Sequence, residues 1–372
     1  MATVEPPHAR DPVNLNQLVQ LPGLFRIGRN LPHQLPLMLR SVGFEAPRLL
    51  ILTGRERSRR VAHDFLETLP AATVTEYFEV KAGTEQAVEE AAAAAVRLGA
   101  DMLVSVGGGS VIDVGKRVQR VHGVPNFVIP TIISNDGLTS PISVLANKEG
   151  RKESFPAAVP VGVAVDLDVI SRSPRKFLVA AAGDVLSNLS ASYDWIRLYE
   201  ASGGVIDFND LAYELAVGAA ESLIGARHVD FEDDLFLTNL IRGQVYSGLA
   251  MGLAGTSRPC SGAEHLISHA IDQLGLAEGE LHGIQVGSIS LFVLSLLSEG
   301  GGSALEFARR VGLPLDWRTL SPGVAASSGS VISLARTVRP GRQTILDSYS
   351  DEEILTECEA FARLMSRGRL RG

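Results

Sequence analysis

Short apolar runs alternate with longer segments of helical spacing between residues 48 and 131. The apolar runs have the length and the branched residues of buried strands, and they cover residues 48–54, 73–80, 101–106 and 127–131. The segments between them carry apolar residues at helical spacing, over residues 57–69, 84–98 and 111–121. Strands that alternate with helices form a parallel sheet covered on both faces, so we expect a Rossmann-like α/β unit.

The pattern changes near residue 175, after which helical spacing dominates. The predicted helices cover residues 177–202, 211–224, 233–254, 263–274, 284–298 and 351–366. We interpret the small-residue runs 300–303 and 327–330 as short loops. We therefore predict an α/β domain over residues 1–172, followed by an all-α domain over residues 173–372.

Composition narrows the class of protein. The hydrophobic share of 45% is ordinary for a soluble globular chain, and the net charge of −8 argues against a general nucleic-acid or membrane-surface binder. The longest apolar run, residues 286–297, is too short to span a bilayer, so we expect a buried helix and no membrane insertion. Two cysteines and no signal-peptide pattern favour a reducing cytoplasm.

A glycine-rich turn lies between a predicted strand and a predicted helix, at Gly107-Gly108-Gly109-Ser110. Glycines let the backbone approach a pyrophosphate, and the new helix offers free N–H groups and its positive dipole end. Ser110 could cap that helix as well as bind phosphate. The alternative is a tight turn without a ligand. Lys116, further along the helix, is interpreted as a solvated residue.

A polar loop follows the last predicted strand, over residues 130–141. In open α/β sheets, ligands gather at the carboxyl ends of the strands. Thr131, Ser134 and Ser140 supply hydroxyl groups there, and Asp136 supplies an acceptor suited to a substrate hydroxyl. An ordinary polar turn explains the same residues equally well.

Three of the eight histidines are candidates for a metal site. His265 and His269 are four residues apart and share one helix face, and His282 precedes a glycine. Together with a carboxylate, two or three imidazoles bind a catalytic divalent metal and leave one coordination position open. The alternative is a pair of core histidines. We expect Glu264 to point elsewhere, and the residues alone do not single out Asp184 among the acids.

These motifs resemble the superfamily of dehydroquinate synthase, glycerol dehydrogenase and iron-containing alcohol dehydrogenase. The shared signs are the Gly-Gly-Gly-Ser-x-x-Asp motif of residues 107–113, the Pro-Thr-x-x-Ser loop of residues 130–134 and a helical domain with metal ligands. The chain is most similar to the sn-glycerol-1-phosphate dehydrogenases. That likeness rests on residues 134–137, 183–188, 193–195, 257–265 and 339–346.

The resemblance implies a set of site residues. Asp184, His265 and His282 would bind one zinc ion per subunit, and His269, Asp136 and Asp184 would contact the substrate. The nicotinamide cofactor, NAD(H) or NADP(H), would be held by Gly107, Gly108, Gly109, Ser110, Asp113, Thr131, Ser134 and Ser140.

Two positions depart from related patterns. Asn188 stands where the iron enzymes carry a fourth protein ligand, which leaves two nitrogens and one oxygen and so favours zinc. Ile284 stands where glycerol-1-phosphate dehydrogenases usually carry an acid after His-Gly, which leaves the exact substrate open.

The implied reaction interconverts dihydroxyacetone phosphate and sn-glycerol 1-phosphate by hydride transfer, while zinc polarises the carbonyl. Arg258 is a candidate for the substrate phosphate, with a structural salt bridge as the alternative. The arginines at positions 55, 57, 59 and 60 permit NADPH, or they form a solvated helix face. The other candidate functions are a dehydrogenase of the same fold for another polyol, phosphorylated or phosphonate-type alcohol or aldehyde, and a dehydroquinate synthase-like cyclase. We also expect a homo-oligomer, of a size that the sequence does not specify.

Overall fold

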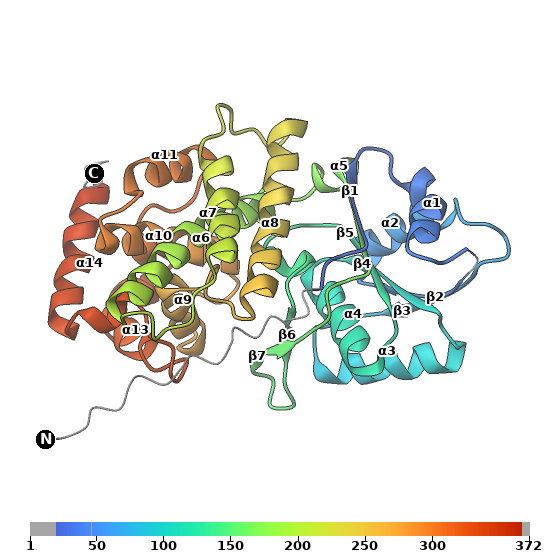
Figure 1. Cartoon of the computed structure of the whole chain (residues 1–372), viewed down its shortest axis with the longest axis horizontal. Coiled ribbons are helices and arrows are strands. Elements are labelled where there is room, and N and C mark those ends of the chain that lie inside the picture. The colour runs from blue at the N-terminus through green and yellow to red at the C-terminus, as the bar shows by residue number, and fades with distance from the viewer. Residues whose placement is uncertain (1–19, 46, 367–372) are drawn as a thin grey trace, which may run out of the picture.

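The computed structural model describes residues 20–45 and 47–366, and its first half is a parallel sheet between helices (Figure 1). Six parallel strands lie in the order β1-β8-β5-β4-β2-β3. Their bounds are β1 Leu24–Gly28, β2 Arg48–Thr53, β3 Val74–Glu79, β4 Met102–Gly107, β5 Asn126–Pro130 and β8 Gly162–Asp166. This confirms the predicted α/β class and the four strands that the apolar runs indicated.

Alternate residues of β2 show why the sheet needs two helical layers. Leu49 and Ile51 pack with the helices α1 and α2, whereas Leu50 and Leu52 pack with α3 and α4 on the other face. The bounds of these helices are α1 Leu35–Ser41, α2 Glu56–Leu66, α3 Glu85–Leu98 and α4 Gly109–His122, and the 3₁₀ turn η1, Pro32–Gln34, precedes α1.

Several short elements were not predicted from the sequence. They are β1, β8, α1 and an antiparallel hairpin of β6 (Ile142–Ala146) and β7 (Lys152–Pro156) that follows the 3₁₀ turn η2 (Asp136–Leu138). The short helix α5, Leu167–Ile170, ends this part of the chain. The predicted domain boundary at residue 172 falls between α5 and the next helix, and it stays a prediction.

The described residues from 175 to 366 are helical and contain no strand, as predicted. The helices are α6 Arg175–Ala201, α7 Asp210–Ile224, α8 Asp234–Ala254, α9 Ala263–Gln273, α10 His282–Leu297, α11 Gly301–Val311, α12 Pro322–Ala326, α13 Ser328–Ala335 and α14 Asp351–Ser366, with 3₁₀ turns η3 (Trp317–Leu320) and η4 (Ile345–Ser348). The two short loops expected at 300–303 and 327–330 are wrong, because α11 begins at Gly301 and α13 at Ser328.

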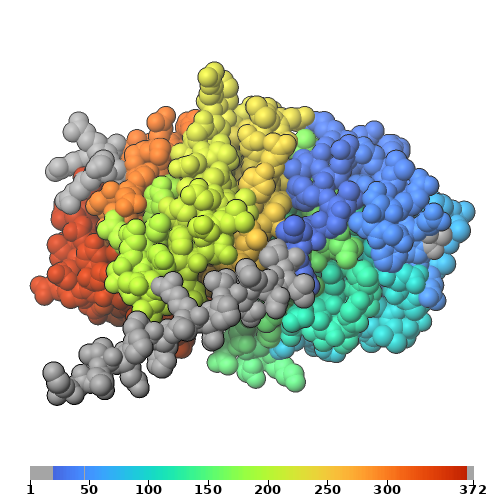
Figure 2. Space-filling view, viewed as in Figure 1, coloured from blue at the N-terminus to red at the C-terminus, as the bar shows by residue number. Residues whose placement is uncertain are grey.

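The helical part adjoins the sheet part along a broad face, as the space-filling view shows (Figure 2). Helix α6 runs through its interior, and nearly every side chain from Leu178 to Trp195 is buried. The turn η2, at the carboxyl end of β5, packs against α6 and α8. The loop that follows the sheet is therefore brought against the helices. Within residues 20–45 and 47–366, no helix has the length and apolar character needed to cross a membrane.

Candidate functional site

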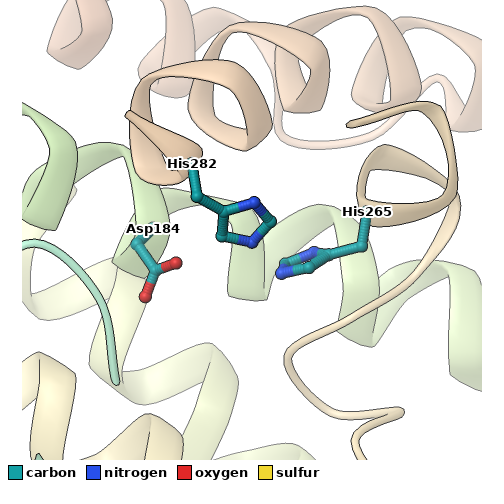
Figure 3. Close-up of side chains that lie close together, drawn as sticks. All are labelled: Asp184, His265 and His282. Atoms are coloured by element: carbon teal, nitrogen blue, oxygen red, sulfur yellow. The ribbon is translucent and has the colours of Figure 1, made fainter. Parts of the chain in front are cut away.

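Three side chains from three helices converge on one point (Figure 3). Asp184 comes from α6, His265 from the first turn of α9 and His282 from the first residue of α10. Each offers one ligand atom, and these atoms lie within 4.8 Å of one another. One carboxylate oxygen and two imidazole nitrogens are a donor set for a divalent metal with room for a further ligand.

Close contact between α6 and α10 places Asp184 beside His282. A Cβ atom on Gly287 would lie 2.5 Å from the Cα atom of Gly183, and one on Gly283 would overlap the carbonyl oxygen of Ala180. The two backbones therefore touch because these positions carry no side chain. Asp184 follows one contact glycine and His282 precedes another, so the helix contact sets the distance between them.

Glu264 holds His265 in place, so the expectation that it points elsewhere is wrong. Its carboxylate is fully buried and lies 2.8 Å from Nδ1 of His265. The same carboxylate accepts hydrogen bonds from the backbone N–H of Gly262 at 2.7 Å and from the Ser190 hydroxyl at 3.1 Å. A carboxylate on Nδ1 favours the tautomer whose Nε2 is free to bind a metal.

His282 is supported by a chain of hydrogen bonds that runs through Ser268 and Gln285 to Asp272. Its Nδ1 lies 3.3 Å from the Ser268 hydroxyl, which donates to the amide oxygen of Gln285 at 2.8 Å. The Gln285 amide nitrogen donates in turn to Asp272 at 3.0 Å. With this direction of donors, Nδ1 of His282 donates to Ser268 and Nε2 is the free nitrogen.

The charges at the site fit a bound cation. Burial, and then the nearby Asp136, raise the pKa of Asp184 well above its usual value. Burial and the neighbouring His265 and His269 lower the pKa of His282 well below its usual value, so its ring is the neutral form that binds metals. A divalent cation here would stabilise the ionised form of Asp184, which burial otherwise disfavours.

His269 lies one turn further along α9, beside the metal donors. Its ring centroid is 6.3 Å from that of His265 and 6.0 Å from that of His282. Burial, followed by the charges of His265 and Arg339, lowers the pKa of His269 to about 4. At neutral pH the ring therefore offers one N–H donor and one lone pair to a molecule bound at this point.

Asp136 reaches the site through the turn η2. Its backbone N–H donates to Asp184 Oδ2 at 3.0 Å. Lys116 fixes the position of this turn through hydrogen bonds. Its ammonium group donates to the carbonyl oxygen of Gly137 in η2 at 2.9 Å and to that of Ile142, the first residue of β6, at 2.5 Å. Lys116 is fully buried, so its interpretation as a solvated residue is wrong.

The glycine-rich turn is closely packed at Gly107 and Gly108 but has free space at Gly109. A Cβ atom would lie 2.6 Å from Val111 at Gly107 and 2.9 Å from Ile132 at Gly108, but would meet nothing within 4 Å at Gly109. The N-cap of α4 is Gly108, which corrects the expectation that Ser110 caps it. Ser110 is exposed in the first turn of the helix, where free N–H groups suit an anion.

The other residues predicted to hold the cofactor differ in their surroundings. Asp113 lies in the second turn of α4, and its carboxylate accepts from the backbone of Val144 at 3.3 Å. Thr131 and Ser134 follow β5, at the same carboxyl edge of the sheet as the glycine-rich turn. The Ser140 hydroxyl lies 3.3 Å from both Lys116 Nζ and the Ile142 carbonyl oxygen, so it already has internal partners.

Asn188 takes part in a hydrogen bond away from the metal donors. It lies one turn after Asp184 on α6 and is almost fully buried. Its amide nitrogen donates to the Ser247 hydroxyl at 2.7 Å. The amide therefore joins α6 to α8, and the described donor set remains Asp184, His265 and His282.

Reading the sequence alone missed Glu264, Ser268, Gln285 and Lys116. Ser268 and Gln285 each lie three residues from a candidate ligand, His265 and His282, and this helical spacing was an available signal. The buried position of Lys116 could not be predicted from local spacing, because its partners Gly137 and Ile142 lie more than 20 residues further along the chain.

Comparison with known proteins shows the family and the fold. The family model described as iron-containing alcohol dehydrogenase matches residues 26–174. The glycerol-1-phosphate dehydrogenase [NAD(P)+] of Thermococcus kodakarensis is 31% identical, over 88% of this chain and 93% of its own. That of Saccharolobus islandicus is 29% identical, over 88% and 92%. Among solved structures, a probable glycerol dehydrogenase from Sinorhizobium meliloti has a TM-score of 0.72 at 23% identity and covers 92% of this chain and 98% of its own, which shows the same fold.

Proposed function

Because the chain belongs to the glycerol-1-phosphate dehydrogenase family, among the iron-containing alcohol dehydrogenases, we propose that it interconverts dihydroxyacetone phosphate and sn-glycerol 1-phosphate with NAD(P)(H). The observation that carries the proposal is the convergence of Asp184, His265 and His282 beside His269 and η2. This combination suits a metal-dependent dehydrogenase, in which a cation polarises the carbonyl while a nicotinamide delivers hydride.

The metal proposed here is one zinc ion per subunit, held by Asp184, His265 and His282. Two nitrogens and one oxygen match catalytic zinc sites, and Glu264 and Ser268 support the two imidazoles from behind. When bound, zinc supplies a Lewis acid that polarises the substrate carbonyl and stabilises negative charge on its oxygen.

The chain's own residues bind and orient the reactants. The glycine-rich turn, from Gly107 to Ser110, would hold the cofactor pyrophosphate, with Thr131 and Ser134 beside it. Asp136 would accept a hydrogen bond from a substrate hydroxyl and so fix the face that receives hydride. His269 would donate its N–H to the substrate or pass a proton to its oxygen through a hydrogen-bonded chain.

The metal site keeps its hydrogen-bond support although Ile284 replaces the usual acid after His282-Gly283. Its side chain is buried in the hydrophobic core of the helical part. The next residue, Gln285, supplies the polar group that joins Ser268 to Asp272. A phosphorylated substrate is the first candidate because the relatives are glycerol-1-phosphate dehydrogenases. A dehydrogenase for another polyol or phosphonate-type alcohol is the second candidate because of the missing acid.

The assay that tests the proposal is a substrate panel with NADH and NADPH. We expect consumption of NAD(P)H with dihydroxyacetone phosphate and the reverse reaction with sn-glycerol 1-phosphate, but little with sn-glycerol 3-phosphate or glycerol. We expect NADPH to support turnover, because Arg55 and Arg59 are exposed just after β2 and the strand does not end in an acid. Net NAD(P)H consumption also distinguishes a dehydrogenase from a cyclase. Turnover of glycerol but not of the phosphorylated compounds would contradict the proposal.

Replacing Ser268 with alanine should lower zinc affinity by about 10- to 100-fold, because the substitution removes the acceptor for His282 Nδ1. Competition with a chelator measures the change. Ser222→Ala on α7 is the matched control, since that hydroxyl donates only to the carbonyl of Ala219 within its own helix. Equal zinc affinity in the Ser268→Ala variant and the wild type would show that this contact does not support the ligand.

The proposal also covers the compartment, the assembly and the partners of the protein. We propose a cytoplasmic homo-oligomer that acts on a small phosphorylated substrate, without a nucleic-acid partner. The two cysteines support a reducing compartment, because both Cys260 and Cys358 are buried as free thiols.

A further inference from the structure

Three arginines gather around the loop that leads into α9. Arg339 donates to the Ser257 hydroxyl at 3.1 Å, and Arg342 approaches the same hydroxyl at 3.4 Å. Arg342 also donates to the carbonyl of Ser261, two residues before α9 begins. Arg258, on the same loop, donates to the carbonyl of Gln343 at 3.1 Å.

The charge of this cluster is not balanced by ion pairs. In the part of the chain that the structure describes, none of the three guanidinium groups has a carboxylate oxygen within 4.0 Å. Burial, and then the charges of Arg258 and Arg339, lower the pKa of Arg342 to about 9. The carboxylates of Asp194 and Glu264 act on Arg342 from beyond 4.0 Å, but burial alone shifts the pKa of Arg339. Three neighbouring cations are costly without a bound anion, and each guanidinium keeps donors beyond those used on the loop.

The cluster lies on the substrate side of the site. The loop that it surrounds continues directly into α9, which carries His265 and His269. Arg339 is close enough to His269 for its charge to act on that ring. The glycine-rich turn, in contrast, belongs to the sheet part, so the cofactor pyrophosphate and this cluster occupy different places.

We propose that Arg339 and Arg342, with Arg258 beside them, bind the phosphate group of the substrate while its carbonyl lies at the metal donors. A phosphate dianion accepts several charge-assisted hydrogen bonds in the planar fork geometry of guanidinium. The inference rests on the proposed function, and it moves the main phosphate contact from Arg258, which the sequence suggested, to the residues near 340. Ser257 orients both guanidinium groups through its single hydroxyl.

The first test compares phosphorylated and unphosphorylated ketone. In zinc-loaded enzyme, Arg339→Ala should lower kcat/KM for dihydroxyacetone phosphate by roughly 10²-fold, the effect of losing hydrogen bonds to a charged group. The loss for dihydroxyacetone, which includes any effect of the Arg339 charge on His269, should be at least about 10-fold smaller, since that ketone makes no such bonds. Arg336→Ala is the matched control, because Arg336 instead pairs with Asp351 at 3.4 Å and donates to the carbonyl oxygen of Tyr349 at 2.7 Å. Equal losses on both ketones would overturn the inference.

The second test needs no turnover. Titration of the zinc- and NADPH-loaded enzyme with inorganic phosphate, followed by calorimetry, should show binding in the wild type and in Arg336→Ala, but strongly weakened binding in Arg339→Ala. Arg339→Lys should recover part of the affinity. If Arg339→Ala does not fold, Arg258→Ala replaces it and should also weaken phosphate binding. Unchanged phosphate affinity in Arg339→Ala overturns the inference. If the wild type binds phosphate in this way but does not reduce dihydroxyacetone phosphate, only the proposed function fails.

Discussion

His265→Ala enzyme should lose the proposed zinc ion and at least about 10³-fold in kcat/KM for dihydroxyacetone phosphate, because a Lewis acid supplies several kcal/mol of carbonyl polarisation. The effect should be large because His265 is one of only three protein donors described at the site. Its removal also leaves Glu264 buried with one hydrogen-bond partner fewer. Metal content by elemental analysis and steady-state kinetics on the same sample measure both losses.

Two controls separate loss of the metal from loss of the fold. His228→Ala changes an exposed histidine outside the site and should keep full zinc content and turnover. NADPH binding to His265→Ala should stay near the wild-type level, because the glycine-rich turn belongs to the sheet part. A His265→Ala protein with full zinc occupancy and normal turnover would refute the assignment of this ligand.

Strong local periodicity made part of the fold predictable. Strand β2 is a continuous apolar run with both faces buried, and the helix α3 has a Thr84 cap and ends at Gly99 in the left-handed region. The strands β1 and β8 have only five residues each, and β1 is a half-buried strand at the edge of the sheet. The equally short β5 was recognised because its apolar run is continuous, whereas the exposed Arg26 interrupts β1 and only three small apolar residues separate Gly162 from Asp166 in β8.

Local spacing also accounts for what could be predicted of the site. The pair His265 and His269 was visible as an i, i+4 repeat, but Asp184 was not, because its proximity to His282 arises from the contact of two helices almost 100 residues apart. Glu264 was expected to point away because adjacent residues on a helix do not face each other. That rule fails at the start of α9. There the Glu264 carboxylate accepts a hydrogen bond from the N–H of Gly262, and the same oxygen also contacts Nδ1 of His265.

Replacing Gly283 with alanine should both destabilise the helical part and weaken the metal site. The added methyl group would overlap the carbonyl of Ala180 and would lie 2.9 Å from that of Ser134. Since both neighbours are backbone atoms, α10 must move away from α6 rather than repack a side chain. Overpacking of this kind costs about 1–3 kcal/mol, and sometimes more. The same movement separates His282 from Asp184, so we expect zinc affinity to fall by at least about 10-fold, as when a ligand loses its support.

Gly218→Ala on α7 is the matched control for this substitution. A Cβ atom there meets nothing within 4 Å, so alanine should stabilise the helix by roughly 0.5–1 kcal/mol through its higher helix propensity. Thermal unfolding with and without zinc, followed by a chelator competition, measures both consequences for the two variants. If Gly283→Ala loses both thermal stability and zinc affinity, the contact between α6 and α10 positions the ligands. A variant that unfolds earlier but binds zinc as tightly as the wild type would show that Asp184 and His282 reach the metal independently of the α6–α10 distance.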